Sequence, residues 1–342
     1  MSEIRRILVV RTDRIGDVVL TLPMVDILRM NFPDSSIAML TKRYTSDLAK
    51  NSENVDDVIL FDDETGLVPF FKMLKIIRSK QFDAAFVAYP RMRLALLLWL
   101  ARVKYRVGSG FRFYSIFFNK RIFEHRKHAK KHELEYNLTL LEKFGCALKK
   151  IEPPWITVSD DNTASVQNKL KDVGVNENEK LVIIHPGSGG SSRDWSIDKF
   201  TQLGKKIMNL PNTKVVVTGS KDEKSLDDNL QNAIGSGAID MSGQLSLLEY
   251  AGLSKLANLL IANSTGPLHI AAAVGTPVIG FFSHITPMTP DRWGPYTNKK
   301  IVFIPQGKPV NCKKCLKNKK SCECMDSISV DEVFEAAKQL LG

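Results

Sequence analysis

Two glycine- and hydroxyl-rich segments in the second half of the chain contain the residue types that bind phosphate groups. The first, HPGSGGSSRDW (185–195), follows an apolar run and precedes a helical pattern. Backbone N–H groups in such a loop can hold phosphate at the positive end of a helix. The segment is neither a Walker loop nor the dinucleotide motif G-x-G-x-x-G. It indicates an anion site, with a plain glycine-rich turn as the alternative.

The second segment, IANSTGPLHIAAAV (261–274), brings hydroxyl groups to the start of another helix. Pro267 occupies a position where proline begins a helix well. The N–H groups at that helix start could bind an anion, and His269 in the first turn would point toward the same place. The alternative for a single such histidine is a hydrogen-bonded residue of the core.

Four of the five cysteines lie near the C-terminus in a lysine-rich segment. Cys312 and Cys315 form a Cys-x-x-Cys pair, and Cys322 and Cys324 form Cys-x-Cys. Four thiolates can hold zinc, but the second pair is more closely spaced than structural zinc pairs usually are. A structural zinc site is therefore one alternative. An odd number of cysteines without an export signal indicates reduced thiols as the other.

The net charge of +11 is concentrated in one segment. Residues 91–150 hold 15 Lys or Arg and four Asp or Glu, whereas the rest of the chain is nearly balanced. Such an excess suits nucleic acid, anionic lipid or a phosphorylated substrate, although it also describes an ordinary solvated surface. The cations that we consider as acceptor-binding candidates are Arg102, Lys104, Arg106, Arg112, Arg126, Lys127, Lys130 and Lys131.

Short apolar runs must position these segments. In the first half they are 7–11, 36–41, 55–62 and 83–90, and in the second half 181–186, 214–219, 259–263 and 277–282. Helical patterns separate them, including 67–78, 196–208, 247–256 and 267–274. Strands that alternate with helices predict right-handed crossovers and mostly parallel sheets. Ligands then bind at the carboxyl ends of the strands.

The length of 342 residues predicts two α/β domains. We place a Rossmann-like, doubly wound domain at 1–155, a linker at 156–165 and a second such domain with a terminal helix at 166–342. The longest apolar run, Leu94 to Ala101, is far shorter than the roughly 20 residues that cross a bilayer. No secretory signal is recognisable, so we expect a cytoplasmic protein.

Five segments in the expected order resemble glycosyltransferase family 9, the lipopolysaccharide heptosyltransferases and their relatives. They are ILVVRTDRIGDVVLTLP, HELEYNLTLLEKFG, HPGSGGSSRDWSIDKF, VVVTGSKDE and STGPLHIAAAVGTPVIGFF. The resemblance implies the GT-B architecture, with two Rossmann-like domains facing across a cleft. The N-terminal domain would bind the acceptor and the C-terminal domain the nucleotide sugar.

The resemblance also implies inverting transfer of a sugar, typically heptose from ADP-heptose, to a lipopolysaccharide core or a related surface glycan. No metal or other cofactor would be required. The expected partners are the nucleotide sugar, a lipid-linked saccharide acceptor and, peripherally, the cytoplasmic face of the inner membrane. Nucleic acid is not expected.

The residue roles follow from the same resemblance. Asp13 matches the proposed general base, for which a loop or helix-capping carboxylate is the alternative, and Asp17 is the better N-cap candidate. The donor-binding positions are Ser188, Arg193, Asp222 or Glu223, Leu245, Ser264, Thr265, Gly266 and His269. Ser264 replaces the aspartate of well-known heptosyltransferases, which leaves a donor with another sugar open.

Two other functions use the same observations. A nucleotide-sugar enzyme of another reaction type, such as an epimerase, would share the C-terminal pocket. An inactive scaffold could bind nucleic acid or anionic lipid through residues 91–150. Aromatic residues that could stack on bases lie among its cations: Phe111, Phe113, Tyr114, Phe117 and Phe118.

Overall fold

Six parallel strands form the sheet of the first of two units in the computed structural model, Met1–Trp155. The structure describes residues 4–176, 178–286, 288–307 and 323–342. The strand order is β3-β2-β1-β6-β7-β8. The strands are β1 (Arg6–Val10), β2 (Ser36–Thr41), β3 (Asp57–Leu60), β6 (Ala84–Val87), β7 (Tyr105–Ser109) and β8 (Lys120–Ile122). A two-stranded hairpin joins β4 (Asp62–Asp63) to β5 (Gly66–Leu67).

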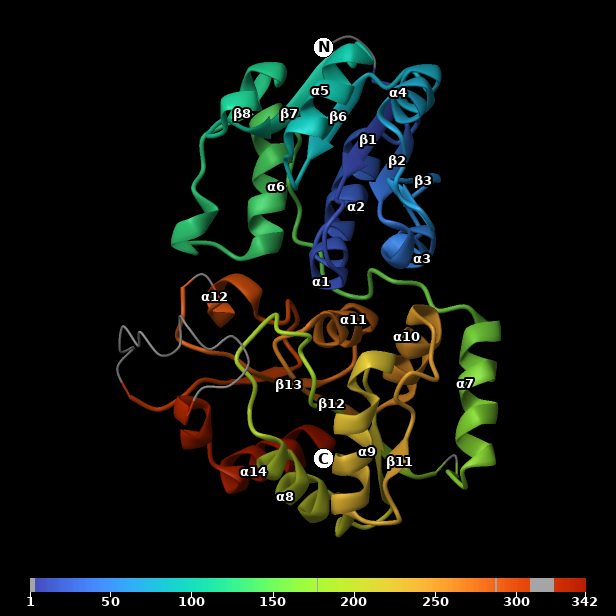
Figure 1. Cartoon of the computed structure of the whole chain (residues 1–342), viewed down its shortest axis with the longest axis vertical. Helices are drawn as coiled ribbons and strands as arrows, with labels where there is room; N and C mark the ends of the chain where they lie inside the picture. Colours follow the sequence, from blue (N-terminus) through green and yellow to red (C-terminus); the bar gives the residue numbers. More distant parts are fainter. Residues whose placement is uncertain (1–3, 177, 287, 308–322) are drawn as a thin grey trace. The chain divides into compact units, whose positions relative to one another are not determined.

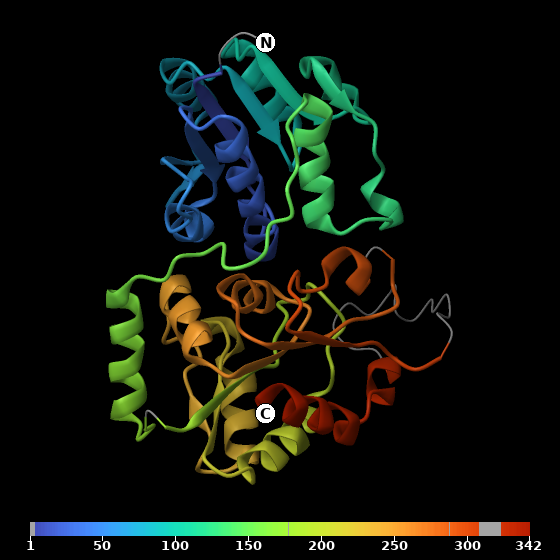
Figure 2. The same ribbon diagram turned by 180° about the vertical axis from the view of Figure 1, so that it is seen from behind.

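Helices cover both faces of this sheet (Figures 1 and 2). They are α1 (Ile15–Val19), α2 (Leu22–Asn31), α3 (Ser46–Lys50), α4 (Phe70–Ser79), α5 (Met92–Leu100) and α6 (Glu133–Phe144). Leu8 and Val10 of β1 pack in one cluster with side chains of α4 and α5. The apolar run at 94–101 therefore forms a core helix, in which Leu94, Leu97 and Leu98 are buried.

The second unit, Ile156–Gly342, repeats the same sheet. Its strands are β9 (Lys180–His185), β10 (Thr213–Val217), β11 (Ile239–Asp240), β12 (Leu259–Asn263), β13 (Val278–Phe281) and β14 (Lys300–Phe303), all parallel. Its order is β11-β10-β9-β12-β13-β14. In each unit the first strand is central, and the strand order reverses beside it. Ligands bind at that point in doubly wound folds, outside the carboxyl ends of the strands.

The helices of the second unit also form two layers. They are α7 (Asp160–Asp172), α8 (Ile197–Met208), α9 (Lys224–Ile234), α10 (Leu247–Leu256), α11 (Gly266–Val274), α12 (Pro290–Trp293) and α14 (Val330–Leu341). The cluster that contains Val182 and Ile184 of β9 also includes side chains of α8, α9 and α14. On the other face, α10 contacts both α7 and α11.

The linker expected at 156–165 is extended only as far as Ser159, because α7 begins at Asp160. The Ser159 hydroxyl accepts a hydrogen bond from the Asn162 N–H, and Asp160 and Asp161 occupy the first turn. Both features favour a helix start. Residues 160–165 therefore belong to the second unit and not to a linker.

None of the helices within the described residues combines the length and the apolarity that a membrane span requires.

Candidate active site

A buried arginine collects three carboxylates at the end of β1 in the first unit. Arg11 is 2% exposed and follows the last residue of the strand. Its Nε donates to Asp13 Oδ1 at 2.7 Å, and its Nη1 donates to Glu133 Oε1 at 3.1 Å. Its Nη2 pairs with Asp17. Asn137 Oδ1 accepts a further bond from Nη1 at 3.2 Å, so every guanidinium nitrogen of Arg11 is used.

Asp17 belongs to this cluster, and the prediction that it caps a helix is wrong. The N-cap of α1 is Arg14, and Asp17 lies in the first turn. Burial raises the pKa of Asp17 to about 6, even though Arg11 opposes the shift, and the neighbouring Asp13 carboxylate raises it further. The side chains of Asp13 and Asp17 are 13% and 14% exposed. One guanidinium thus holds two adjacent, partly accessible carboxyl groups.

Asp17, beside Asp13, is a candidate for a group that accepts a proton near neutral pH. It is close to the point where the strand order of the first sheet reverses, and a carboxyl group with a pKa of about 6 is ionised at neutral pH yet can accept a proton. The Tyr44 hydroxyl donates to the Asp13 carbonyl oxygen at 2.5 Å, which holds the backbone of the loop after β1.

In the second unit, Asn263 joins the glycine-rich loop to the end of β12. Its Nδ2 donates to the Pro186 carbonyl at 2.6 Å, and its Oδ1 accepts from the Trp195 N–H at 2.9 Å. The Ser191 hydroxyl donates to the Ser264 carbonyl at 2.9 Å. These bonds bring the two candidate phosphate-binding segments together at the strand-order reversal of the second sheet.

Glu223 closes the other side of the loop. Its Oε1 accepts from the Gly189 N–H at 3.1 Å, and its Oε2 accepts from the Ser220 hydroxyl at 2.8 Å. A Cβ at Gly187 would lie 2.2 Å from Glu223 Oε1, so a side chain there would displace the Glu223 carboxylate from the loop. Glu223 is therefore occupied with the loop, whereas Asp222 beside it is exposed. Leu245 is half-buried in the loop that precedes α10.

Arg193 and Ser188 are buried within the same loop, at 5% and 7% exposure. Asp194 beside them has a pKa that burial raises to about 6, although the hydroxyls of Ser188 and Ser192 and the charge of Arg193 lower it. At the end of β9, burial lowers the pKa of His185 to about 4, and its Nδ1 lies 3.0 Å from Thr218 Oγ1. His185 is thus a neutral imidazole at the base of the loop.

The turn after β12 lies next to the glycine-rich loop. Thr265 is the N-cap of α11 and Pro267 lies in its first turn. His269, also in that turn, is 4% exposed, and Ser264 and Gly266 are half-buried. Partly accessible backbone groups at a helix start suit a phosphate.

The basic segment divides into two sets. Arg106 donates to the Phe117 carbonyl at 2.7 Å, Arg126 pairs with Glu133, and Lys131 pairs with Glu124 at 2.6 Å. These three cations stabilise the unit itself, and they are the weaker acceptor candidates. The exposed candidates are Arg102, Lys104, Arg112 and Lys130. Lys127 follows Arg126 in a short 3-10 helix.

The possible zinc site falls mostly on Cys312, Cys315 and Cys322, which lie outside the described residues. Cys324 lies in the 3-10 helix η5 (Glu323–Ser327). In the described part of the chain, no three or more His, Cys, Asp and Glu side chains are placed to share a metal ion.

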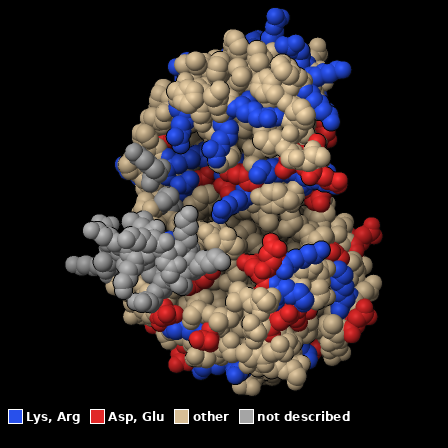
Figure 3. All heavy atoms as spheres, in the orientation of Figure 1, with Lys and Arg blue, Asp and Glu red and all other residues tan. Residues whose placement is uncertain are grey.

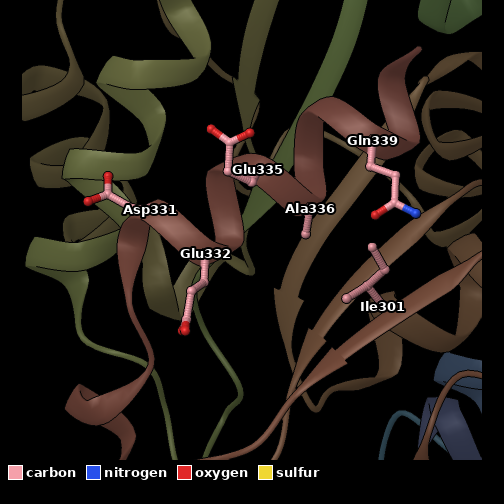
Figure 4. Close-up of a pocket in the computed structure, with 6 residues that line it drawn as sticks. All are labelled: Ile301, Asp331, Glu332, Glu335, Ala336 and Gln339. Atoms are coloured by element: carbon pink, nitrogen blue, oxygen red, sulfur yellow. The ribbon is translucent and has the colours of Figure 1, made fainter.

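A pocket of about 690 Å³ on α14 and β14 is a poor candidate for the donor site. Its lining consists of Ile301, Asp331, Glu332, Glu335, Ala336 and Gln339. Figure 4 shows that the three carboxylates leave α14 in different directions and do not converge. Asp331 pairs with Lys206 at 2.8 Å. Three acidic side chains would repel a diphosphate.

The family model "Glycosyltransferase family 9 (heptosyltransferase)" matches residues 70–326, more than half of the chain. The chain belongs to this family. The enzyme is 28% identical to a "Putative glycosyltransferase" of Haemophilus influenzae, over 88% of this chain and 89% of that one. A family 9 crystal structure from Veillonella parvula aligns with a TM-score of 0.86 at 22% identity, over 100% and 98% of the two chains.

A second solved structure, "E. coli ADP-heptose lps heptosyltransferase II", aligns with a TM-score of 0.81 at 19% identity over 98% of each chain. The protein is therefore a glycosyltransferase with the GT-B fold, and it is related to the heptosyltransferases of lipopolysaccharide biosynthesis.

Three residues of the site, Arg11, Glu133 and Asn263, were given no role from the sequence, and a fourth, Asp17, was assigned to a helix cap. Glu133 contacts Arg11, and Asn263 contacts the glycine-rich loop. A polar residue at the end of an apolar run could have pointed to two of them, since Arg11 directly follows β1 and Asn263 is the last residue of β12.

Proposed function

We propose that the enzyme transfers heptose from ADP-heptose to a lipid-linked saccharide of the lipopolysaccharide core, with inversion at the anomeric carbon. The observation that carries this proposal is the carboxylate pair that Arg11 holds at the end of β1. Inverting transfer requires one base to take the proton of the acceptor hydroxyl as its oxygen attacks C1. Asp13 is the base candidate from the sequence, and the raised pKa of Asp17 makes it a second one.

The donor is proposed to bind in the second unit. Ser188, Arg193, Thr265, Gly266 and His269 would hold the diphosphate, because the loop and the start of α11 bring a cation and N–H groups together there. Charge grows on the departing diphosphate, so these groups can act without a metal. Asp222 and Leu245 would contact the nucleoside. Support for an ADP-linked heptose comes from the name of the E. coli structure.

The acceptor is proposed to bind in the first unit, near Asp13 and Asp17, with the exposed cations of the basic segment attracting its anionic groups. A lipid-linked acceptor would place the enzyme at the cytoplasmic face of the inner membrane. Ser264, at the position where the family resemblance leads us to expect an aspartate, is the reason to vary the sugar of the donor in the test.

The test is release of nucleoside diphosphate from a panel of donors. ADP-heptose, ADP-glucose and UDP-glucose would each be incubated with the enzyme, with and without a heptose-deficient lipopolysaccharide precursor. We expect acceptor-dependent release of ADP from ADP-heptose. Acceptor-dependent release of ADP from ADP-glucose instead would mean that the transferred sugar is glucose, while the proposed reaction type would stand. No acceptor-dependent release from any donor would contradict transfer to this class of acceptor.

A further inference from the structure

Exposed apolar side chains are concentrated in one segment of the first unit. Fourteen large hydrophobic side chains are exposed in the described residues, and six of them lie between Met92 and Phe123. They are Met92, Trp99, Phe111, Phe113, Ile116 and Phe123. Phe113 is 78% exposed, and Ile116 and Phe123 are 65% and 66% exposed. Such a local concentration on a folded surface marks an interaction site more often than scattered residues do.

Two of these exposed side chains, Phe113 and Ile116, lie on one short 3-10 helix. Residues Phe113–Phe117 form the 3-10 helix η2, in which residues three apart lie one above the other. Phe113 and Ile116 therefore share one face, which is exposed, while Tyr114 and Phe118 are buried and hold the helix in place. The 3-10 helix η2 lies against α5, with Trp99 next to Phe117.

The other aromatic rings are fixed by their neighbours. The Phe123 ring lies against Gly110, where a Cβ would meet it at 2.6 Å, and it makes an edge contact with Phe111 at 5.6 Å between centroids. Phe111 stacks on His125 at 3.6 Å. Trp99 contacts Phe117 at 5.4 Å. These rings are therefore held in position without a partner molecule.

The charge around this apolar surface has one sign. Between residues 84 and 123 the sequence contains eight Lys or Arg and no Asp or Glu. Arg112 is the N-cap of η2, Lys120 and Arg121 belong to β8, and all three are exposed. In the view of Figure 3, Lys and Arg appear with few acidic side chains on the side of the first unit where β7 and β8 lie.

We propose that α5, η2 and β8 form a surface that docks on an anionic lipid bilayer, with Phe113, Ile116 and Phe123 inserted between the headgroups. Exposed aromatic and aliphatic side chains flanked by cations are the features of interfacial membrane binding. The inference rests on the proposed lipid-linked acceptor, since a bilayer would present both that acceptor and the anionic headgroups.

A bilayer fits the residues better than single-stranded nucleic acid. Stacking on bases needs open aromatic faces, but Tyr114 and Phe118 are buried and one face of Phe111 already lies on His125. Ile116 offers no ring at all. Insertion into headgroups needs only protruding apolar atoms, which Phe113 and Ile116 supply.

Vesicle co-sedimentation of the full chain tests the proposal. Phosphatidylcholine vesicles with and without phosphatidylglycerol would be mixed with wild type, with Phe113→Ser/Ile116→Ser and with Arg112→Glu/Lys120→Glu. We expect wild type to bind only the anionic vesicles. Each double variant should lower the partition coefficient at least tenfold. Higher salt should weaken wild-type binding, because the range of attraction is about 8 Å at physiological ionic strength.

Matched controls change the same residue types elsewhere. Leu148→Ser/Val173→Ser removes two other exposed apolar side chains, and Lys205→Glu/Lys255→Glu makes the same change in net charge in the second unit. Both controls should bind as wild type does. Equal vesicle binding by the surface variants and the controls would overturn the proposal. So would a wild-type protein that does not bind anionic vesicles, or one that binds a single-stranded oligonucleotide and not the vesicles.

The outcome is separable from that of the proposed function. Transfer to an acceptor dispersed in detergent needs no bilayer, so Phe113→Ser/Ile116→Ser should keep wild-type turnover in detergent. Loss of vesicle binding with turnover retained would support the docking surface. Vesicle binding by a protein without any transferase activity would leave the surface intact and contradict the proposed function alone.

Discussion

Arg11 carries a charge in a place where burial disfavours it. Asp13, Asp17 and Glu133 offset that cost and raise the pKa of Arg11 above its ordinary value. Removing one partner from such a buried group is costly, because the remaining charges are left uncompensated. The cluster therefore fixes the geometry of the Asp13–Asp17 pair, while the pair keeps its partial access to solvent.

Asparagine substitutions at the two aspartates test whether they act as one base. We expect Asp13→Asn and Asp17→Asn each to lower kcat on the order of 100-fold, with little change in the affinity for ADP measured by calorimetry. The double variant should be no slower than the slower single variant, because residues that act as a unit are not additive. Wild-type kcat should fall as the pH drops below about 6, where Asp17 becomes protonated.

Asp26→Asn is the matched control, since Asp26 lies in α2 of the same unit and also has a raised pKa. It should turn over as wild type does. Near-wild-type kcat in either site variant would exclude that carboxylate as part of the base and assign the role to the other one.

At the scale of elements, apolar runs predicted the strands because strands buried on both faces read as continuous hydrophobic segments. The run at 259–263 is β12 and the run at 36–41 is β2. The first six residues of α7 were assigned to the linker because they are polar or small, and none of residues 160–165 is buried. Short strands such as β8 are mostly exposed and give no such signal.

Asp227, a buried residue of α9, should make the free energy of unfolding depend on pH. Burial raises the pKa of Asp227 to about 7, and the side chain lies where a Cβ on Gly219 would be 1.8 Å from its Oδ2. An unfolded aspartate has a pKa of about 4. The folded state therefore binds the proton more tightly, and the stabilisation is present below pH 4 and lost as the pH rises through about 7.

Asp227→Asn replaces the carboxyl group by a neutral group of similar shape. Between pH 5 and 8, wild type should lose about 2.5 kcal/mol of unfolding free energy that the variant keeps. Urea unfolding at the two pH values measures this difference directly. The same pH dependence in both proteins would mean that Asp227 is ionised in the folded state.

At the scale of the whole molecule, the two units have the same strand order. The alternation of strands and helices in the sequence was enough to predict two α/β units. The composition of the site could be predicted less completely. Arg11 and Glu133 are 122 residues apart in the chain, and Asn263 meets Pro186 across 77 residues. No local pattern reports such contacts, because they depend on how the strands are ordered in each sheet.

The stereochemistry of the product tests the central claim most directly. ADP-heptose and a heptose-deficient lipopolysaccharide precursor would be incubated with the enzyme, and the anomeric configuration of the new bond would be read by NMR from its coupling constants. A base that activates the acceptor hydroxyl for one direct displacement predicts a bond with the configuration opposite to that of the donor. A product that retains the donor configuration would contradict the account, since one direct displacement at the anomeric carbon inverts it.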